Sequence, residues 1–285
     1  MCCFTRQVTS VSATRIFARS LPDPLPQWQA AASATAPAAP SVADPRRQLI
    51  VYQMAASATE AVAMVLPLPV VPDGQDTAMR FIDLQAAPRW FSALDDLWPR
   101  PASRGRSADL PAPQPEGMLA VHTVGAFIAS YVPRPSDFAR LDPRFRLDEA
   151  LLTAEPRWRD WGFAVFQFQP GRIEPHPMAF TFQRRDPRRL FLPTVHIHDG
   201  TRPATAGFDH VLYIQRTERD AWPSRTTGIN PAAPRRSYDW DESPGLVNLR
   251  DERLAGAPGL LLPDQHVLRL NLHGRFVNQD IELAA

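Results

Sequence analysis

The chain has 285 residues and a formal net charge of +1, because 31 basic residues stand against 30 acidic ones, and every basic residue is an arginine. Without lysine the chain cannot form a Schiff base, and it lacks the lysine of Walker-type and kinase phosphate sites. The near-neutral charge gives no general attraction to nucleic acid or anionic lipid, and no apolar stretch approaches the ~18 residues of a membrane helix. These counts exclude pyridoxal-phosphate enzymes and the usual phosphoryl-transfer enzymes. They predict a cytoplasmic bacterial protein with no nucleic-acid or membrane partner.

Cysteine and proline usage bound the organisation of the chain. Cys2 and Cys3 are the only cysteines, and two adjacent thiols cannot staple distant segments or supply the spaced ligands of a zinc ribbon. Two Pro/Ala-rich stretches, residues 20–47 and 99–117, cannot bury a core. The segments beside them are too short to fold alone. We therefore expect one domain over residues 1–285, with a disordered insertion at 20–47 and a loop at 99–117.

Strands dominate the predicted elements. Cys3–Val8 and Thr14–Arg19 are predicted to form a hairpin at the start of the chain. Further strands are predicted at residues 48–54, 61–70, 121–132, 163–168, 177–182, 190–198 and 210–215. At the end of the chain, Val267–Leu272 and Phe276–Leu283 are predicted to form a second hairpin through His273-Gly274-Arg275.

Predicted helices are few and short. Residues 88–98 carry apolar side chains at helical spacing. Ser136 is expected to cap a short turn, and Asp148 a helix that runs to Trp161 with an interruption at Pro156. The fold class is therefore α+β, a strand-rich single domain with a mainly antiparallel sheet and a few short helices.

The first candidate site is Cys2. Methionine aminopeptidase removes Met1 when the next residue is small, and Cys2 would then carry both a thiol and a free α-amine. An α-amine titrates near pH ~8, low enough to act as general base for its own side chain. The predicted first strand suits an N-terminal nucleophile. The alternative is that both thiols are packed in an interior strand as small hydrophobic groups.

The beginning of the chain resembles the choloylglycine hydrolase and penicillin V acylase family of N-terminal nucleophile hydrolases. That family begins Met-Cys and has an Arg-Asn-Met/Leu-Asp segment about a hairpin later; here Cys2 is followed by Arg19-Ser20-Leu21-Pro22-Asp23. The resemblance implies an amide-cleaving enzyme in which Cys2 is the nucleophile and Arg19 contacts a small-molecule or peptide substrate. The chain departs from the pattern in Ser20, which replaces the asparagine, and in the additional Pro22.

A broader resemblance extends over most of the chain. It is similar to uncharacterised bacterial proteins that open Met-Cys-Cys-Phe and carry segments like Ile16–Arg19, Leu49–Tyr52, Val65–Pro69 and Trp161–Phe166. This resemblance implies a common fold unit that includes both cysteines. It implies no reaction.

The second candidate site is a group of histidines. His196 and His198 are two residues apart on a predicted strand and therefore share a face. If that strand pairs with the strand at His210 as a hairpin, three imidazoles converge, and three histidines with an open position are a known catalytic zinc arrangement. The cofactor would be zinc or another transition metal, with Asp199 or Asp209 orienting a ring. The alternative is that these are hydrogen-bonded histidines at strand ends.

A cluster of arginines has two interpretations. Arg184, Arg185, Arg188 and Arg189 surround Asp186-Pro187, a pattern typical of a solvated turn, with an anion clamp as the alternative.

The sequence does not specify the function, and three hypotheses follow from it. The leading one is a cytosolic thiol-dependent amidohydrolase that uses Cys2 and Arg19. The alternatives are a metal-binding protein with a site at His196, His198 and His210, and a non-enzymatic interaction or scaffold domain.

Overall fold

The computed structural model describes residues 2–21, 47–72, 78–98, 127–198, 200–216 and 239–284, with the backbone alone at Cys2. The strands are β1 (Cys2–Phe4), β2 (Ser10–Ser20), β3 (Arg47–Ala58), β4 (Val62–Leu68), β5 (Met79–Ile82), β6 (Ile128–Val132), β7 (Gly162–Phe168), β8 (Gly171–Ile173), β9 (Met178–Gln183), β10 (Arg189–Leu192), β11 (His196–Ile197), β12 (Thr205–Ile214), β13 (Asp241–Glu242), β14 (Leu268–Val277) and β15 (Ile281–Ala284). The helices are α1 (Trp90–Asp95) and α2 (Glu149–Ala154), with 3-10 turns η2 (Pro135–Arg140), η3 (Pro143–Phe145), η4 (Pro156–Trp158) and η5 (Glu252–Leu254). The predicted α+β class is confirmed.

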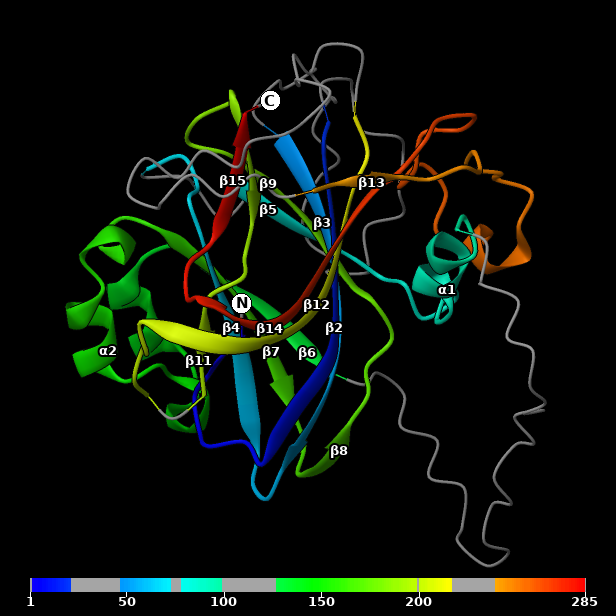
Figure 1. Ribbon diagram of the computed structural model, residues 1–285. Coiled ribbons are helices and arrows are strands. Elements are labelled where there is room, and N and C mark those ends of the chain that lie inside the picture. The colour runs from blue at the N-terminus through cyan, green and yellow to red at the C-terminus, as the bar shows by residue number, and fades with distance from the viewer. Residues whose placement is uncertain are drawn as a thin grey trace, which may run out of the picture.

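Most strands belong to two sheets. The first has the order β11-β1-β4-β7-β6, and the second has the order β13-β14-β12-β2-β3-β9-β5 with β8 beside β3. All neighbouring strands run antiparallel except β1 beside β11 and β2 beside β12. A separate pair joins β10 to β15. Helices α1 and α2 lie on opposite sides of the strands (Figure 1).

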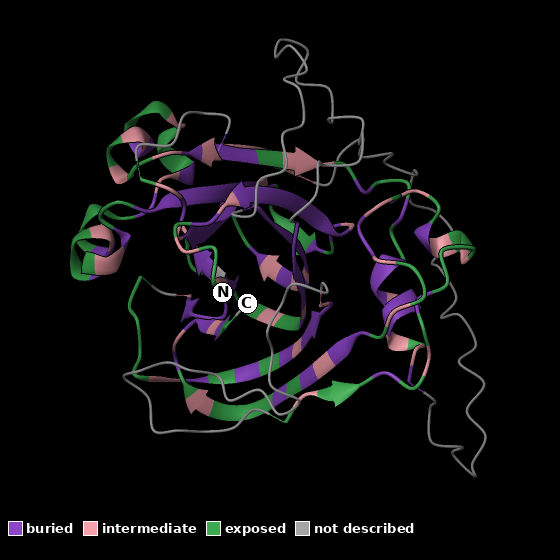
Figure 2. Ribbon diagram, turned by 90° about the horizontal axis from the view of Figure 1, so that it is seen from above, coloured by how far each residue is buried: buried purple, intermediate pink, exposed green. Residues whose placement is uncertain are grey.

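The main core lies between the two sheets. Every residue of β4 is buried, and β7 is buried except at Gln167, because both strands lie inside the first sheet and are covered on both faces. A second core covers the other face of the larger sheet, where Phe17 and Tyr213 pack against Trp90 and Phe91 of α1 and against the segment 247–267. In Figure 2 the central strands are buried along their length, and exposed residues gather on helical turns and outer strands.

Both predicted hairpins are wrong. β1 pairs with β4 and β11, whereas β2 pairs with β3 and β12 in the other sheet. At the other end, β14 runs through Gly274 without turning, because β12 offers it a matching strand from Ile214 opposite Leu268 to Thr205 opposite Val277. β15 pairs with β10. In each case a long-range partner that buries the strand replaces the sequence neighbour.

The helix predictions succeed where a capping residue is present. The Asp148 carboxylate accepts the N–H of Ala150, and α2 ends before Pro156. Ser136 does not act as a cap; η2 begins after Arg134 with Pro135 in its first turn and no side-chain cap. The helix predicted at residues 88–98 is shorter, since α1 covers Trp90–Asp95.

The predicted insertion is shorter than expected at both ends, because Ser20 belongs to β2 and Arg47 begins β3. The remainder of that insertion, 22–46, and the predicted loop 99–117 lie outside the described residues. Within the described ranges, no helix is long and apolar enough to cross a membrane.

Candidate functional site

The two candidate sites of the sequence meet at β1. Cys2 is the first residue of this strand, and its register partner in the parallel pair with β11 is His196. Cys3 follows with two partners, Ile197 on β11 and Val65 on β4. The predicted nucleophile and the predicted histidine site therefore occupy neighbouring strands, although they are far apart in the sequence.

His196 and His210 form a hydrogen bond across the two sheets. Their Nε2 atoms are 3.1 Å apart, and their ring centroids are 4.7 Å apart. Only 7% of His196 and 1% of His210 is exposed. Both rings also contact Phe208, at centroid distances of 4.5 and 5.2 Å. The pair is thus a polar contact enclosed by the main core.

The third histidine joins this group by its ring. The His198 ring lies 5.2 Å from that of His196 and edge-on to Phe4 at 5.9 Å. The three imidazoles converge as expected, but not through the predicted hairpin, because β11 pairs with β1 and β12 pairs with β2 and β14.

A metal at these histidines stays a prediction. Among the side chains that the structure describes, no group of three His, Cys, Asp or Glu residues is arranged to hold a metal ion. Asp199 lies outside the described residues. Asp209 was expected to orient a ligand ring; instead it accepts the N–H of Ala13 at 3.0 Å and pairs with His273 at 3.1 Å on the sheet surface.

Burial keeps both bonded histidines neutral. It lowers the pKa of His196 to about 3, with smaller contributions from the positive charge of the amino terminus and from His198. Burial also holds the pKa of His210 well below 6.5, assisted by the same terminal charge and the neighbouring histidines. At pH 7 both imidazoles are therefore uncharged, and each has one N–H that can donate and one nitrogen that can accept a hydrogen bond.

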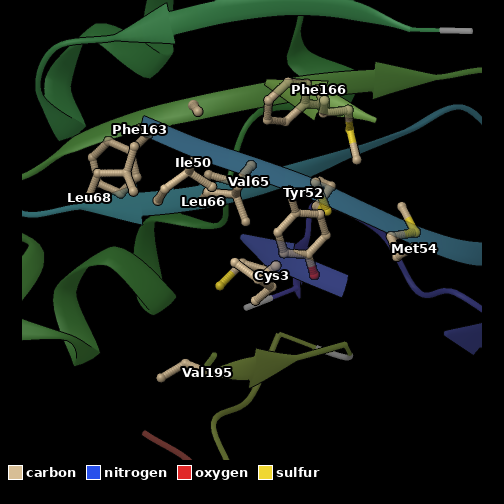
Figure 3. Close-up of a cluster of buried hydrophobic side chains, with 14 of the residues drawn as sticks. Cys3, Ile50, Tyr52, Met54, Val65, Leu66, Leu68, Phe163, Phe166 and Val195 are labelled. Atoms are coloured by element: carbon tan, nitrogen blue, oxygen red, sulfur yellow. The ribbon is translucent and has the colours of Figure 1, made fainter. Parts of the chain in front are cut away.

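Cys3 has the packing role that the sequence offered as the alternative for both cysteines. It has no exposed surface and belongs to the main core. Figure 3 shows it among buried side chains that include Tyr52, Val65 and Val195. Of the two thiols, Cys2 is thus the remaining candidate for chemistry.

The structure places Arg19 in a different environment from the one expected of a substrate contact. Arg19 is 5% exposed, and its guanidinium donates to the carbonyl oxygens of Leu260 (2.8 Å), Gly259 (2.7 Å) and Ser20 (3.4 Å). Along β2 it lies five residues beyond Thr14, the register partner of His210. Arg19 therefore anchors the segment 259–260 through these hydrogen bonds.

The arginine cluster matches the turn interpretation. Arg188 binds the Asp186 carboxylate, Arg185 pairs with Asp160, and Arg189 pairs with Glu282. Arg184 is buried and donates to the carbonyl of Arg189. Since these guanidinium groups are engaged within the protein, they do not form an anion clamp.

Sequence reasoning missed the residues that hold β11 in place. Asn278 binds both backbone groups of His196: its Oδ1 accepts the N–H at 2.7 Å, and its Nδ2 donates to the C=O at 2.8 Å. Asp280 accepts the N–H groups of Thr194 and Val195 at 3.0 and 3.1 Å. The segment Asn278-Gln279-Asp280 carries turn-type residues, and no sequence spacing relates it to residue 196.

Two hollows of the described surface lie elsewhere. One, of about 530 Å³, is lined by η2, α2 and η4, including Phe138, Leu152 and Arg159. A second, of about 170 Å³, lies between α1 and the segment 246–261. Neither is lined by β1 or β11.

Comparison with known proteins gives structural overlap alone. No protein-family model matches the chain, and no curated protein matches it. It overlays on the crystal structure of baculovirus P35 with a TM-score of 0.48 and 14% identity, covering 100% of this chain and 99% of that one. For a mutated baculovirus P35 after caspase cleavage, the TM-score is 0.44 and the identity is 14%, with 96% of this chain and 100% of that one covered. For the caspase-8/P35 complex, the TM-score is 0.41 and the identity is 11%, with 96% of each chain covered. None of these three is a choloylglycine hydrolase or a penicillin V acylase.

Proposed function

We propose that the protein is a thiol-dependent amidohydrolase whose nucleophile is Cys2. The observation that carries the proposal is the register of β1 and β11, which sets the backbone of Cys2 opposite that of His196. Neighbouring strands lie about 4.8 Å apart, so an imidazole at the partner position is within reach of a thiol and an α-amine at Cys2. Removal of Met1 supplies that amine.

The proposed roles follow from the basicity of the two groups. The α-amine of Cys2, with an ordinary pKa near ~8, takes the thiol proton. His196 does not compete for this proton, because its pKa is about 3, and it serves as a neutral hydrogen-bonding group.

The reaction then has two balanced steps. The thiolate attacks the amide carbonyl carbon, the C–N bond breaks, and the leaving amine takes the proton held by the α-ammonium. The resulting thioester is hydrolysed by water, from which the same α-amine removes a proton. The products are a carboxylic acid, an amine and the regenerated thiol.

The test combines intact-mass spectrometry with turnover of a panel of acyl p-nitroanilides. We expect active protein to lack Met1, the Cys2→Ala variant to lose turnover, and the His196→Ala variant to retain a reduced rate. Cys3→Ala is the matched control, because Cys3 is buried in the main core. Met1 retained on active protein, or unchanged turnover in Cys2→Ala, contradicts the proposal.

The same preparation tests the competing function, a non-enzymatic interaction domain. Caspase-8 serves as a protein probe, since baculovirus P35 has been seen in complex with it. A stable complex with no turnover of any amide would replace the amidohydrolase with an interaction function.

A further inference from the structure

β11 is a very short strand, so its ladder hydrogen bonds alone hold it weakly in place. It has two residues, and among the strands that the structure describes it lies at the edge of its sheet beside β1. Such an edge leaves a row of backbone groups without a ladder partner. Two side chains fill this role, as Asn278 and Asp280 together bind the amides of residues 194, 195 and 196.

The Asp280 side chain and the Asn278 carbonyl belong to an ionic network with buried carboxylates and half-buried arginines. The Asp280 side chain is 3% exposed and pairs with Arg157 at 3.0 Å. Arg157 also pairs with Glu155, at 3.3 Å, and Glu155 receives two hydrogen bonds from Arg202, at 2.9 and 3.0 Å. Arg202 closes the network by donating to the carbonyl of Asn278 at 2.9 Å.

The charges of this network compensate one another locally. Two carboxylates face two guanidinium groups, so no buried charge is left alone, and removal of one member would leave its partner uncompensated. The network is held by ion pairs and by the hydrogen bonds of Arg202, while Arg157 Nε and Nη2 and Asp280 Oδ2 have no hydrogen-bond partner among the described residues. The backbone it binds here is that of His196 and the two residues before it.

We propose that Asn278 and Asp280 are positioning residues that hold His196 beside Cys2. This inference rests on the proposed function. His196 is held from two directions: β1 pairs with it on one side, and Asn278 binds its N–H and C=O on the other. Since Asn278 contacts the backbone and not the ring, its loss leaves the imidazole intact but releases its position.

The test measures alkylation of full-length protein by iodoacetamide, with Cys2 and Cys3 quantified separately by mass spectrometry. Mutation of a residue that orients a metal ligand typically changes activity by ~10–100-fold, and by analogy we expect Asn278→Ala to slow Cys2 alkylation about tenfold. Asn278→Asp keeps an acceptor for the His196 N–H and is expected to give an intermediate rate. Asn248→Ala is the matched control, because Asn248 also binds backbone, at Arg250.

Buried Cys3 reports unfolding within the same sample. The proposed function itself is overturned if Cys2 of the wild type reacts no faster than a short peptide that begins with cysteine. A fast wild type with an equally fast Asn278→Ala overturns the positioning role alone. If Asn278→Ala exposes Cys3, the Asn278→Asp variant decides: an intermediate Cys2 rate supports the role, and a wild-type rate overturns it.

Discussion

The Nε2 atoms of His196 and His210, 3.1 Å apart, join β11 of one sheet to β12 of the other. One nitrogen must donate and the other accept. His210 Nδ1 is buried and has no hydrogen-bond partner in the described part of the chain. An unpaired lone pair is less costly there than an unpaired N–H. His210 therefore carries its proton on Nε2 and donates, and His196 accepts with its proton on Nδ1.

This pair makes the protein sensitive to acid. The folded-state pKa of both histidines lies below the unfolded value of about 6.5, so their contribution to stability is complete above that pH. It is lost as the pH falls from about 6.5 towards about 3, the folded value for His196, because the unfolded chain binds protons that the folded chain does not.

The loss amounts to up to ~1.4 kcal/mol per pH unit for each histidine. Urea unfolding at pH 7 and at pH 5 measures it, and the midpoint should fall at the lower pH. The variant His210→Gln removes one titrating group and should show a smaller difference between the two conditions. An equal difference in wild type and variant contradicts the assignment.

A second prediction concerns the bulge in β2. Ala13 has φ of 51°, a left-handed conformation, at a point where the register with β3 shifts between Ser12 and Arg15. Glycine adopts this conformation without the Cβ clash, so Ala13→Gly should stabilise the protein by about 0.5–1 kcal/mol. Ala55→Gly, across from Ser12 in regular strand, should instead destabilise it by a similar amount. Thermal unfolding measures both variants, and the midpoint should rise in Ala13→Gly and fall in Ala55→Gly.

Gly256 marks a close approach between two backbones. A Cβ atom at this position would lie 2.5 Å from the carbonyl oxygen of Ala86, and backbone cannot move aside as a flexible side chain can. Gly256→Ala should therefore cost about 1–3 kcal/mol in the free energy of unfolding. Gly207→Ala is the control, because a Cβ there meets open space. Equal midpoints in chemical denaturation would count against the close approach.

Arg19 is expected to stabilise the fold without affecting the reactivity of Cys2. Loss of its buried hydrogen bonds to Leu260 and Gly259 in Arg19→Ala should cost about 2–3 kcal/mol. The exposed Arg188, paired with Asp186, provides the comparison, and Arg188→Ala should cost below ~0.5 kcal/mol. Iodoacetamide labelling of Cys2 in folded Arg19→Ala should match wild type. A slowed reaction would restore a role for Arg19 at the site.

Metal analysis separates the two uses of the histidines. The Nε2 atoms of His196 and His210 are already bonded to each other, so we expect well below one zinc per chain after purification. Elemental analysis of wild type and His196→Ala measures this directly. Stoichiometric metal that disappears in the variant would favour the metal-binding alternative over the thiol hydrolase.

The positions of helices and strands were more predictable from the sequence than the pairing of the strands. Local signals located α2, where the Asp148 side chain caps the first turn and Pro156 stops the helix. The apolar run at residues 61–70 likewise predicted a buried strand, which the structure has at Val62–Leu68. Pairing was not readable, because β1 and β2 are both interior strands, and burial on both sides decided their partners over proximity in sequence.

The candidate site shows the same division. The rings of His196 and His198 lie close together although β11 ends at Ile197, and His210 joins them from the other sheet. Asn278 could not be foreseen, since its importance comes from two hydrogen bonds to a backbone 82 residues away. The carbonyl partners of Arg19 at residues 259 and 260 could not be predicted, because they approach it only in three dimensions.

The pairing of β1 with β11 also determines when the first sheet can be completed during synthesis of the chain. The first strand cannot complete its sheet until residue 197 has been made. At about 5–20 residues per second, that delay is roughly 10–40 s. Throughout this interval β1 can pair with β4, which ends at Leu68, but has yet to meet its parallel partner β11. The sheet that contains Cys2 therefore closes late in synthesis.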